Sequence, residues 1–107
     1  MINIYSNTIE VEGLILEIDQ LCNIENEKKQ YGAICTAIRQ QSGMKRAEFA
    51  RWLGVPYRTF QDWELGNTKI PEYVLRLIAY KVKIENMLKE GRLIHNVPSS
   101  GSKKDKT

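Results

Sequence analysis

The stretch that decides the fold is RQQSGMKRAEFARWLGVPYRTFQDWELGNTKIP, residues 39–71. Arg46–Leu53 has apolar residues at helical spacing and is followed by Gly54, which can end a helix by adopting a left-handed conformation. Pro56 can then open a second helix that runs to Leu65, because the first turn of a helix does not use the backbone N–H that proline lacks. This stretch therefore predicts two short helices joined by a tight turn.

Two longer helices are predicted on either side of this pair. Asn26 can cap a helix that begins at the next residue and stops near Gly43, since an asparagine side chain accepts hydrogen bonds from free N–H groups of the first turn. Gly32 weakens the interior of this helix. Pro71 can open a last helix that runs to Glu90. The pattern predicts an all-α fold, a compact bundle of four to five helices. The domain that contains these helices is expected to span residues 27–96.

Two helices joined by a glycine turn, the second with polar side chains at its start, make a helix-turn-helix, which places its second helix in the major groove of DNA. Residues 39–71 resemble the Cro and phage-repressor type of this motif, the xenobiotic-response-element family of bacterial and phage regulators, and the agreement extends into the last helix. The matching positions are Gly43-Met44, Phe49-Ala50, Leu53-Gly54-Val55, Phe60, Trp63, Glu64, Gly66 and Pro71. The resemblance implies a lambda-repressor-like fold and a sequence-specific, DNA-binding repressor of transcription that acts in the cytoplasm.

The resemblance also implies which residues meet double-stranded DNA. The helix from Pro56 to Leu65 is expected to read bases, chiefly through Arg58, because a guanidinium group can bridge O6 and N7 of guanine. Asp62 is expected to orient Arg58 from four residues away, rather than to contact cytosine. The other expected contacts to bases or phosphates are Lys45, Arg46, Tyr57, Thr59, Gln61 and Lys69. The alternative for Arg58 and Lys69 is that each is a charged side chain in solvent that makes no contact with DNA.

One expected contact lies inside the protein. In the family, an arginine late in the first helix reaches the glutamate near the end of the recognition helix, which matches Arg39 and Glu64 here. The resemblance therefore implies a structural ion pair between these two residues. Trp52 and Trp63 are expected in or near the core.

The charges are separated along the chain. Residues 1–26 carry five acidic and no basic residues, although the whole chain has a net charge of +3. For this acidic N-terminal extension we favour a helix from about Thr8 to Cys22. The alternative is short strands with a turn at Asn7-Thr8, because the apolar residues Ile9 and Val11 alternate with polar ones as in a strand. The basic tail, residues 97–107, is rich in Ser, Gly and Lys and is expected to be disordered.

The acidic extension leaves a second function open. It either packs on the basic surface of its own domain or binds a protein partner. In the latter case the protein would be an antitoxin, which neutralises a protein toxin through this segment and represses its own promoter through the helix-turn-helix.

The last helix has two apolar stripes, and one small core cannot bury both. The second stripe is a possible dimer or partner surface, or part of it packs on the N-terminal segment; it consists of Tyr73, Leu77, Tyr80, Ile84 and Met87. A homodimer on an inverted repeat is expected, because one short helix reads few base pairs and two helices about 34 Å apart meet successive major grooves.

The remaining residue types argue against other classes of protein. Cys22 and Cys35 do not form a CxxC pair, and His95 is the only histidine, so a zinc site would lack ligands. We expect two reduced, largely buried thiols, no metal and no cofactor. The chain has no catalytic pairing of His with Cys or Ser and no phosphate-binding glycine loop, which argues against an enzyme. It also has no apolar run long enough to cross a membrane.

Overall fold

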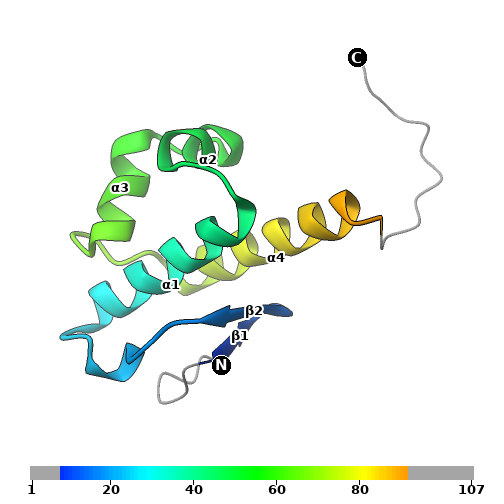
Figure 1. Ribbon diagram of the computed structural model, residues 1–107. Helices are drawn as coiled ribbons and strands as arrows, with labels where there is room; N and C mark the ends of the chain where they lie inside the picture. Colours follow the sequence, from blue (N-terminus) through cyan, green and yellow to red (C-terminus); the bar gives the residue numbers. More distant parts are fainter. Residues whose placement is uncertain (1–7, 92–107) are drawn as a thin grey trace.

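The computed structural model describes residues 8–91, which form four helices and one antiparallel pair of strands (Figure 1). In chain order the elements are β1 (Thr8–Val11), β2 (Leu14–Glu17), a short 3-10 helix η1 (Leu21–Asn23), α1 (Glu27–Ser42), α2 (Arg46–Leu53), α3 (Tyr57–Leu65) and α4 (Glu72–Lys89). Helices α1 and α4 pack against each other in the middle of the molecule. Helices α2 and α3 lie on one side of them, and the β1–β2 hairpin lies on the other.

The four helices begin and end within one residue of the predicted positions. The side chain of Asn26 accepts a hydrogen bond from the backbone N–H of Lys29 at 2.9 Å, as a helix cap should. Pro56 and Pro71 each stand immediately before the first residue of a helix. Gly54 ends α2 with a φ of 77°, a conformation that glycine adopts without strain. The four predicted helices are confirmed.

The prediction of an all-α fold is wrong, because the N-terminal segment forms a β-hairpin. Glu12 and Gly13 connect the strands with φ values of 51° and 84°, the positive values that a two-residue hairpin turn requires. Val11 pairs with Leu14 directly across this turn. The favoured helix over residues 8–22 is not found, and short strands, the alternative, form instead. Thr8 begins β1, whereas Asn7, the first residue of the expected turn, lies outside the described residues.

The hairpin forms because it buries more apolar surface than a helix would. Ile9, Val11, Leu14 and Leu16 alternate with exposed residues and all face the same side of the hairpin. A helix through this segment would separate Ile9 from Val11 by about 200° around its axis, so it could not bury both. The strand period of two places all four side chains against α1 and α4.

The hairpin and the helices share one hydrophobic core. The four inward-facing apolar residues of β1 and β2 belong to the same buried cluster as Ile34 and Ile38 of α1, Phe60 of α3 and Leu75 of α4. The boundary expected near residue 26 thus separates regions of different charge, but not separately packed units. The exposed face of the hairpin carries Glu10 and Glu17.

The two cysteines have different surroundings. Both are free thiols, but only Cys35 is buried, so the prediction that both are largely buried is wrong for Cys22. Burial is the main reason that the pKa of Cys35 is raised. In the described part of the chain, no helix combines the length and the apolar character needed to cross a membrane. His95 and the basic tail lie outside the described residues.

Candidate nucleic-acid interface

An aromatic contact fixes α3 against α2. The rings of Phe49 and Phe60 are both buried, and their centroids lie 5.3 Å apart at an angle of 58°. The connection between α2 and α3 is short. Within it, the N–H of Val55 donates a hydrogen bond to the carbonyl oxygen of Ala50 at 3.0 Å. The two helices are therefore held together at their apolar sides, and the first turn of α3 is left at the surface.

That first turn carries the residues expected to meet DNA. Tyr57, Arg58 and Thr59 are exposed, and 83% of the Arg58 side chain is accessible to solvent. Gln61 is half-buried one turn further along the helix. Lys45, the residue before α2, is exposed as well. The N-terminal half of α3 thus presents polar and aromatic side chains, while Phe60 faces the core.

Arg58 lies beside Asp62, one turn further along α3. Arg58 Nε is 3.5 Å from Asp62 Oδ1, and the same Oδ1 accepts a hydrogen bond from Asn67 Nδ2 at 3.2 Å. The carbonyl oxygen of Asp62 also accepts bonds from the N–H groups of Asn67 and Thr68. The loop after α3 therefore fixes Asp62, which can hold Arg58 in place. The pair is too exposed to add much stability.

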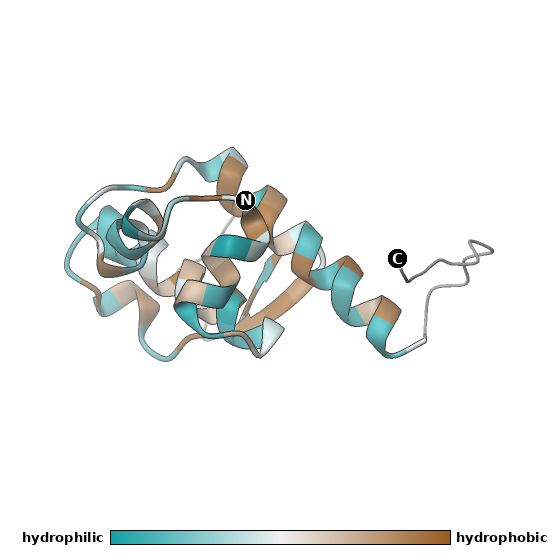
Figure 2. Ribbon diagram, turned by 90° about the horizontal axis from the view of Figure 1, so that it is seen from above, coloured by the Kyte–Doolittle hydropathy of each residue, from teal (hydrophilic) through white to brown (hydrophobic). Residues whose placement is uncertain are grey.

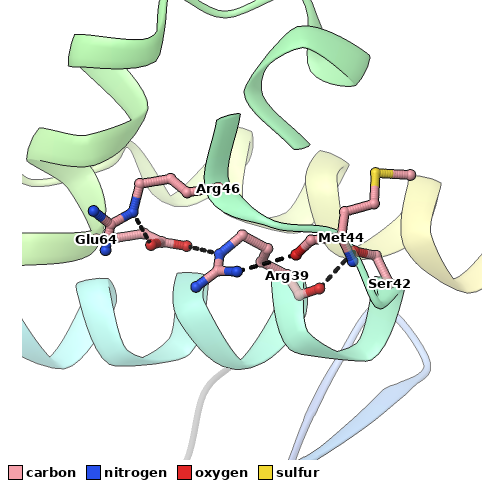
Figure 3. A network of polar contacts seen from close by, with 5 residues as sticks. All are labelled: Arg39, Ser42, Met44, Arg46 and Glu64. Carbon is pink, nitrogen blue, oxygen red and sulfur yellow. Dashed lines mark hydrogen bonds and ion pairs between the residues drawn. The ribbon is translucent and has the colours of Figure 1, made fainter. Parts of the chain in front are cut away.

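A buried glutamate ties three helices together (Figure 3). Glu64 of α3 exposes 1% of its side chain and accepts hydrogen bonds from Arg39 Nε at 2.6 Å and from Arg46 Nε at 2.7 Å. Arg39 also donates from Nη1 to the carbonyl oxygen of Met44 at 3.0 Å. The structure thus brings Arg39 and Glu64 together, as the family resemblance implies. It adds Arg46, which the sequence analysis assigns to a phosphate contact.

Arg46 is held at the edge of this network. The hydrogen bond to Glu64 is the largest cause of its raised pKa, and a hydrogen bond to the side chain of Tyr57 raises it further. Its side chain remains 29% exposed. A guanidinium group has five N–H donors, so bonds to Glu64 and Tyr57 leave donors for another acceptor. Arg46 is therefore a charged group fixed next to the first residue of α3.

Gly32 allows α1 to approach the end of α3, a role that the sequence analysis missed. A Cβ atom at this position would lie 2.6 Å from the carbonyl oxygen of Glu64 and 2.7 Å from that of Trp63. Any larger residue would have to push the two helices apart. A glycine inside an otherwise helical segment was the available signal, since it often marks close contact between backbones.

Lys69, in the loop after α3, is engaged by the protein itself. Its Nζ lies 3.1 Å from Glu27 Oε1 and 4.7 Å from the ring centroid of Tyr31. The Tyr31 hydroxyl donates a hydrogen bond to Glu72 Oε1 at 3.2 Å. Partial burial and then the charge of Glu72 raise the pKa of this tyrosine. A phosphate would therefore have to compete with Glu27 for Lys69.

The predicted residues other than Gln61, which is half-buried, fall into two groups. Those displayed at the surface of α3 and before α2 are Lys45, Tyr57, Arg58 and Thr59. Arg46, Asp62 and Lys69 are held by contacts within the protein. In comparisons with known proteins, no family model, curated protein or solved structure matches this chain.

Proposed function

We propose that the protein is a sequence-specific DNA-binding repressor of transcription that reads the major groove with α3. The observation that carries this proposal is the asymmetry of α3. Phe60 and Glu64 fix one side of the helix, while Tyr57 and Arg58 are displayed at the start of the other. An α-helix fits the major groove, and there an arginine can distinguish guanine through O6 and N7.

The Glu64 network supports the proposal because it joins α3 to α1 and α2. Recognition of bases needs side chains whose position is set before binding, since ordering them at the interface costs free energy. Glu64 joins α3 to α1 through Arg39 and to α2 through Arg46. In this arrangement Arg46 contributes its free guanidinium donors to a backbone phosphate next to the recognition helix.

The position of the hairpin's acidic residues is compatible with DNA on the α2–α3 side. The exposed carboxylates of the hairpin, Glu10 and Glu17, lie on the opposite side of α1 and α4 from α3 (Figure 1). Phosphates on the α3 side would therefore not meet these charges. The acidic extension and the proposed DNA surface are compatible for this reason.

The antitoxin alternative has less support. Its basis is the acidic N-terminal segment, but the inward-facing residues of β1 and β2, Ile9, Val11, Leu14 and Leu16, lie in the core of the domain. A protein partner could reach only the outer face of the hairpin, where Glu10, Ile15 and Glu17 are exposed. The packing thus gives the segment a structural role that needs no toxin.

The proposal can be tested by selecting binding sites from a pool of random DNA duplexes and measuring affinities by fluorescence anisotropy. For Arg58→Ala we expect the preference for the selected site over shuffled DNA to fall about tenfold to a hundredfold, the worth of one arginine–guanine contact. Lys89→Ala is the control, because it removes the same charge from the far end of α4.

The control Lys89→Ala should slightly lower the affinities for the selected site and for shuffled DNA, and it should leave the ratio of the two unchanged. A second arm uses the selected duplex with 7-deazaguanine in place of guanine, which removes the N7 acceptor. It should weaken binding of the wild type but not of Arg58→Ala. Equal losses in both proteins would refute the assigned role of Arg58, and failure to enrich any site would refute sequence-specific binding.

A further inference from the structure

Two parts of the surface have no role in the reading of bases. One is the outer face of α4, where hydrophobic and hydrophilic residues alternate (Figure 2). None of the described residues indicates a partner for its apolar side chains, of which three are exposed (Tyr73, Leu77 and Tyr80) and two half-buried (Ile84 and Met87). The other is the ion pair between Lys69 and Glu27, which lies beside the end of α3. Both members of this pair are described, so its effect on the binding of DNA can be worked out.

The loop after α3 packs against the first turn of α1. A Cβ atom at Gly66, the first residue of the loop, would lie only 2.7 Å from Cγ of Lys29. Near the other end of the loop, Ile70 is fully buried and anchors the chain in the core. The loop is thus held at both ends, and this places the side chain of Lys69 beside that of Glu27.

The ammonium group of Lys69 is held by the protein but stays open to a second anion. Its Nζ lies 3.1 Å from Glu27 Oε1 and over the ring of Tyr31, and the Tyr31 hydroxyl is in turn bonded to Glu72. The side chains of Lys69 and Glu27 are 40% and 61% exposed. Glu27 is the first residue of α1, where the free N–H groups of the helix favour a negative charge. The carboxylate therefore stays beside Lys69 in the free protein.

DNA bound by α3 would bring phosphates to this pair. Helix α3 has nine residues and is therefore about 13 Å long. When Tyr57 and Arg58 of its first turn lie against the bases, its far end reaches the edge of a major groove that is about 12 Å wide. The phosphates line that edge, and Lys69 lies in the loop just beyond the end of α3. A phosphate and Glu27 would then meet the same ammonium group.

We propose that Glu27 is an internal competitor of DNA, which occupies Lys69 in the free protein and is replaced by a backbone phosphate in the complex. One ion pair is broken as the other forms, so Lys69 adds less affinity than an unpaired lysine would. The displaced carboxylate also stays near the phosphate and repels it. Glu27 therefore lowers the affinity for DNA of any sequence, because phosphates carry no sequence information. The inference rests on the proposed function for the placement of the DNA.

Fluorescence anisotropy with the selected duplex and a random duplex tests this competition. Glu27→Gln should bind both duplexes about two- to fivefold more tightly than the wild type, the change expected when one exposed ion pair no longer has to be broken. The ratio of the two affinities should not change. The matched control is Glu25→Gln, which removes the same charge from an exposed position two residues earlier and should give a smaller gain.

A double variant shows whether the gain comes from Lys69. In a Lys69→Gln background, Glu27→Gln should tighten binding no more than Glu25→Gln does, because the lysine for which Glu27 and phosphate compete is gone. The plot of log affinity against log salt concentration should be steeper for Glu27→Gln than for the wild type by up to about one unit, since Lys69 then neutralises a phosphate without giving up a partner.

Circular dichroism will show that the compared variants are folded. Equal tightening by Glu27→Gln and Glu25→Gln, or a gain from Glu27→Gln that persists without Lys69, would overturn the inference and leave the proposed function intact. A wild type that enriches no site but shows the expected coupling of Glu27 and Lys69 on the random duplex would refute sequence-specific binding alone. A folded protein that binds no duplex would refute both.

Discussion

Replacing Glu64 by glutamine should destabilise the fold by an amount that the Arg39–Glu64–Arg46 network allows us to work out. The amide keeps the shape of the carboxylate but can accept at only one end, so its NH₂ group would face one of two arginine donors. The two bonds lost or weakened, at 2.6 and 2.7 Å, join charged groups, and each such bond contributes about 1.5–3 kcal/mol.

Partial exposure of the two arginines lowers the total loss expected from these two bonds. Arg39 and Arg46 are 16% and 29% exposed, so water can restore some of their solvation when Glu64 is gone. We therefore expect a loss of about 3 kcal/mol in the free energy of unfolding, the low end of the range for a broken buried pair. For a domain of this size the melting temperature should fall by about 12 °C or more.

Urea unfolding followed by tryptophan fluorescence measures this loss, since Trp63 lies next to Glu64 in α3. Asp62→Asn is the matched control: it makes the same acid-to-amide change on the same helix, in a pair with a separation of 3.5 Å, and should cost less than about 1 kcal/mol. In an Arg39→Ala background, Glu64→Gln should cost measurably less than in the wild type. Equal stability of the Glu64→Gln and Asp62→Asn proteins would refute the reasoning.

Three further predictions concern the core and its thiols. Leu16→Ala should cost about 2–5 kcal/mol of unfolding free energy and Ile15→Ala much less, because only Leu16 faces the core; equal effects in urea unfolding would show that the hairpin is not integral to the fold. Gly32→Ala should lower the melting temperature, although alanine is the better helix former by about 1 kcal/mol, and a rise would contradict the close approach of α1 and α3. Iodoacetamide should label Cys22 in the native protein and Cys35 only after unfolding, because burial raises the pKa of Cys35 and blocks access; mass spectrometry that found both labelled at the same rate would disprove this.

The helices could be predicted because their ends carry local chemical signals. Asn26 and the two prolines mark starts, and Gly54 marks an end, in each case through the backbone of the helix itself. The hairpin could not be predicted with the same ease. Its apolar residues also allow a helix, and what decides between the two is their packing against α1 and α4, which come later in the sequence.

The site was predictable to a similar extent. The pairing of Arg39 with Glu64 and the position of Arg58 at the surface of α3 both followed from a resemblance. The contacts of Arg46 and Lys69 could not be predicted in this way, because they depend on how loops and helices meet in three dimensions. Lys69 pairs with Glu27 at the start of α1, which is distant in sequence, and no local pattern shows that contact.

The most direct test of the central claim, that this domain recognises a DNA sequence, is the ratio of two affinities at one salt concentration. Fluorescence anisotropy would compare the duplex enriched by selection with a shuffled duplex of equal length and base composition. A sequence-specific regulator should prefer the enriched duplex by a factor of about a thousand or more. A ratio near one, measured with folded protein, would mean that α3 reads no bases and would contradict the account.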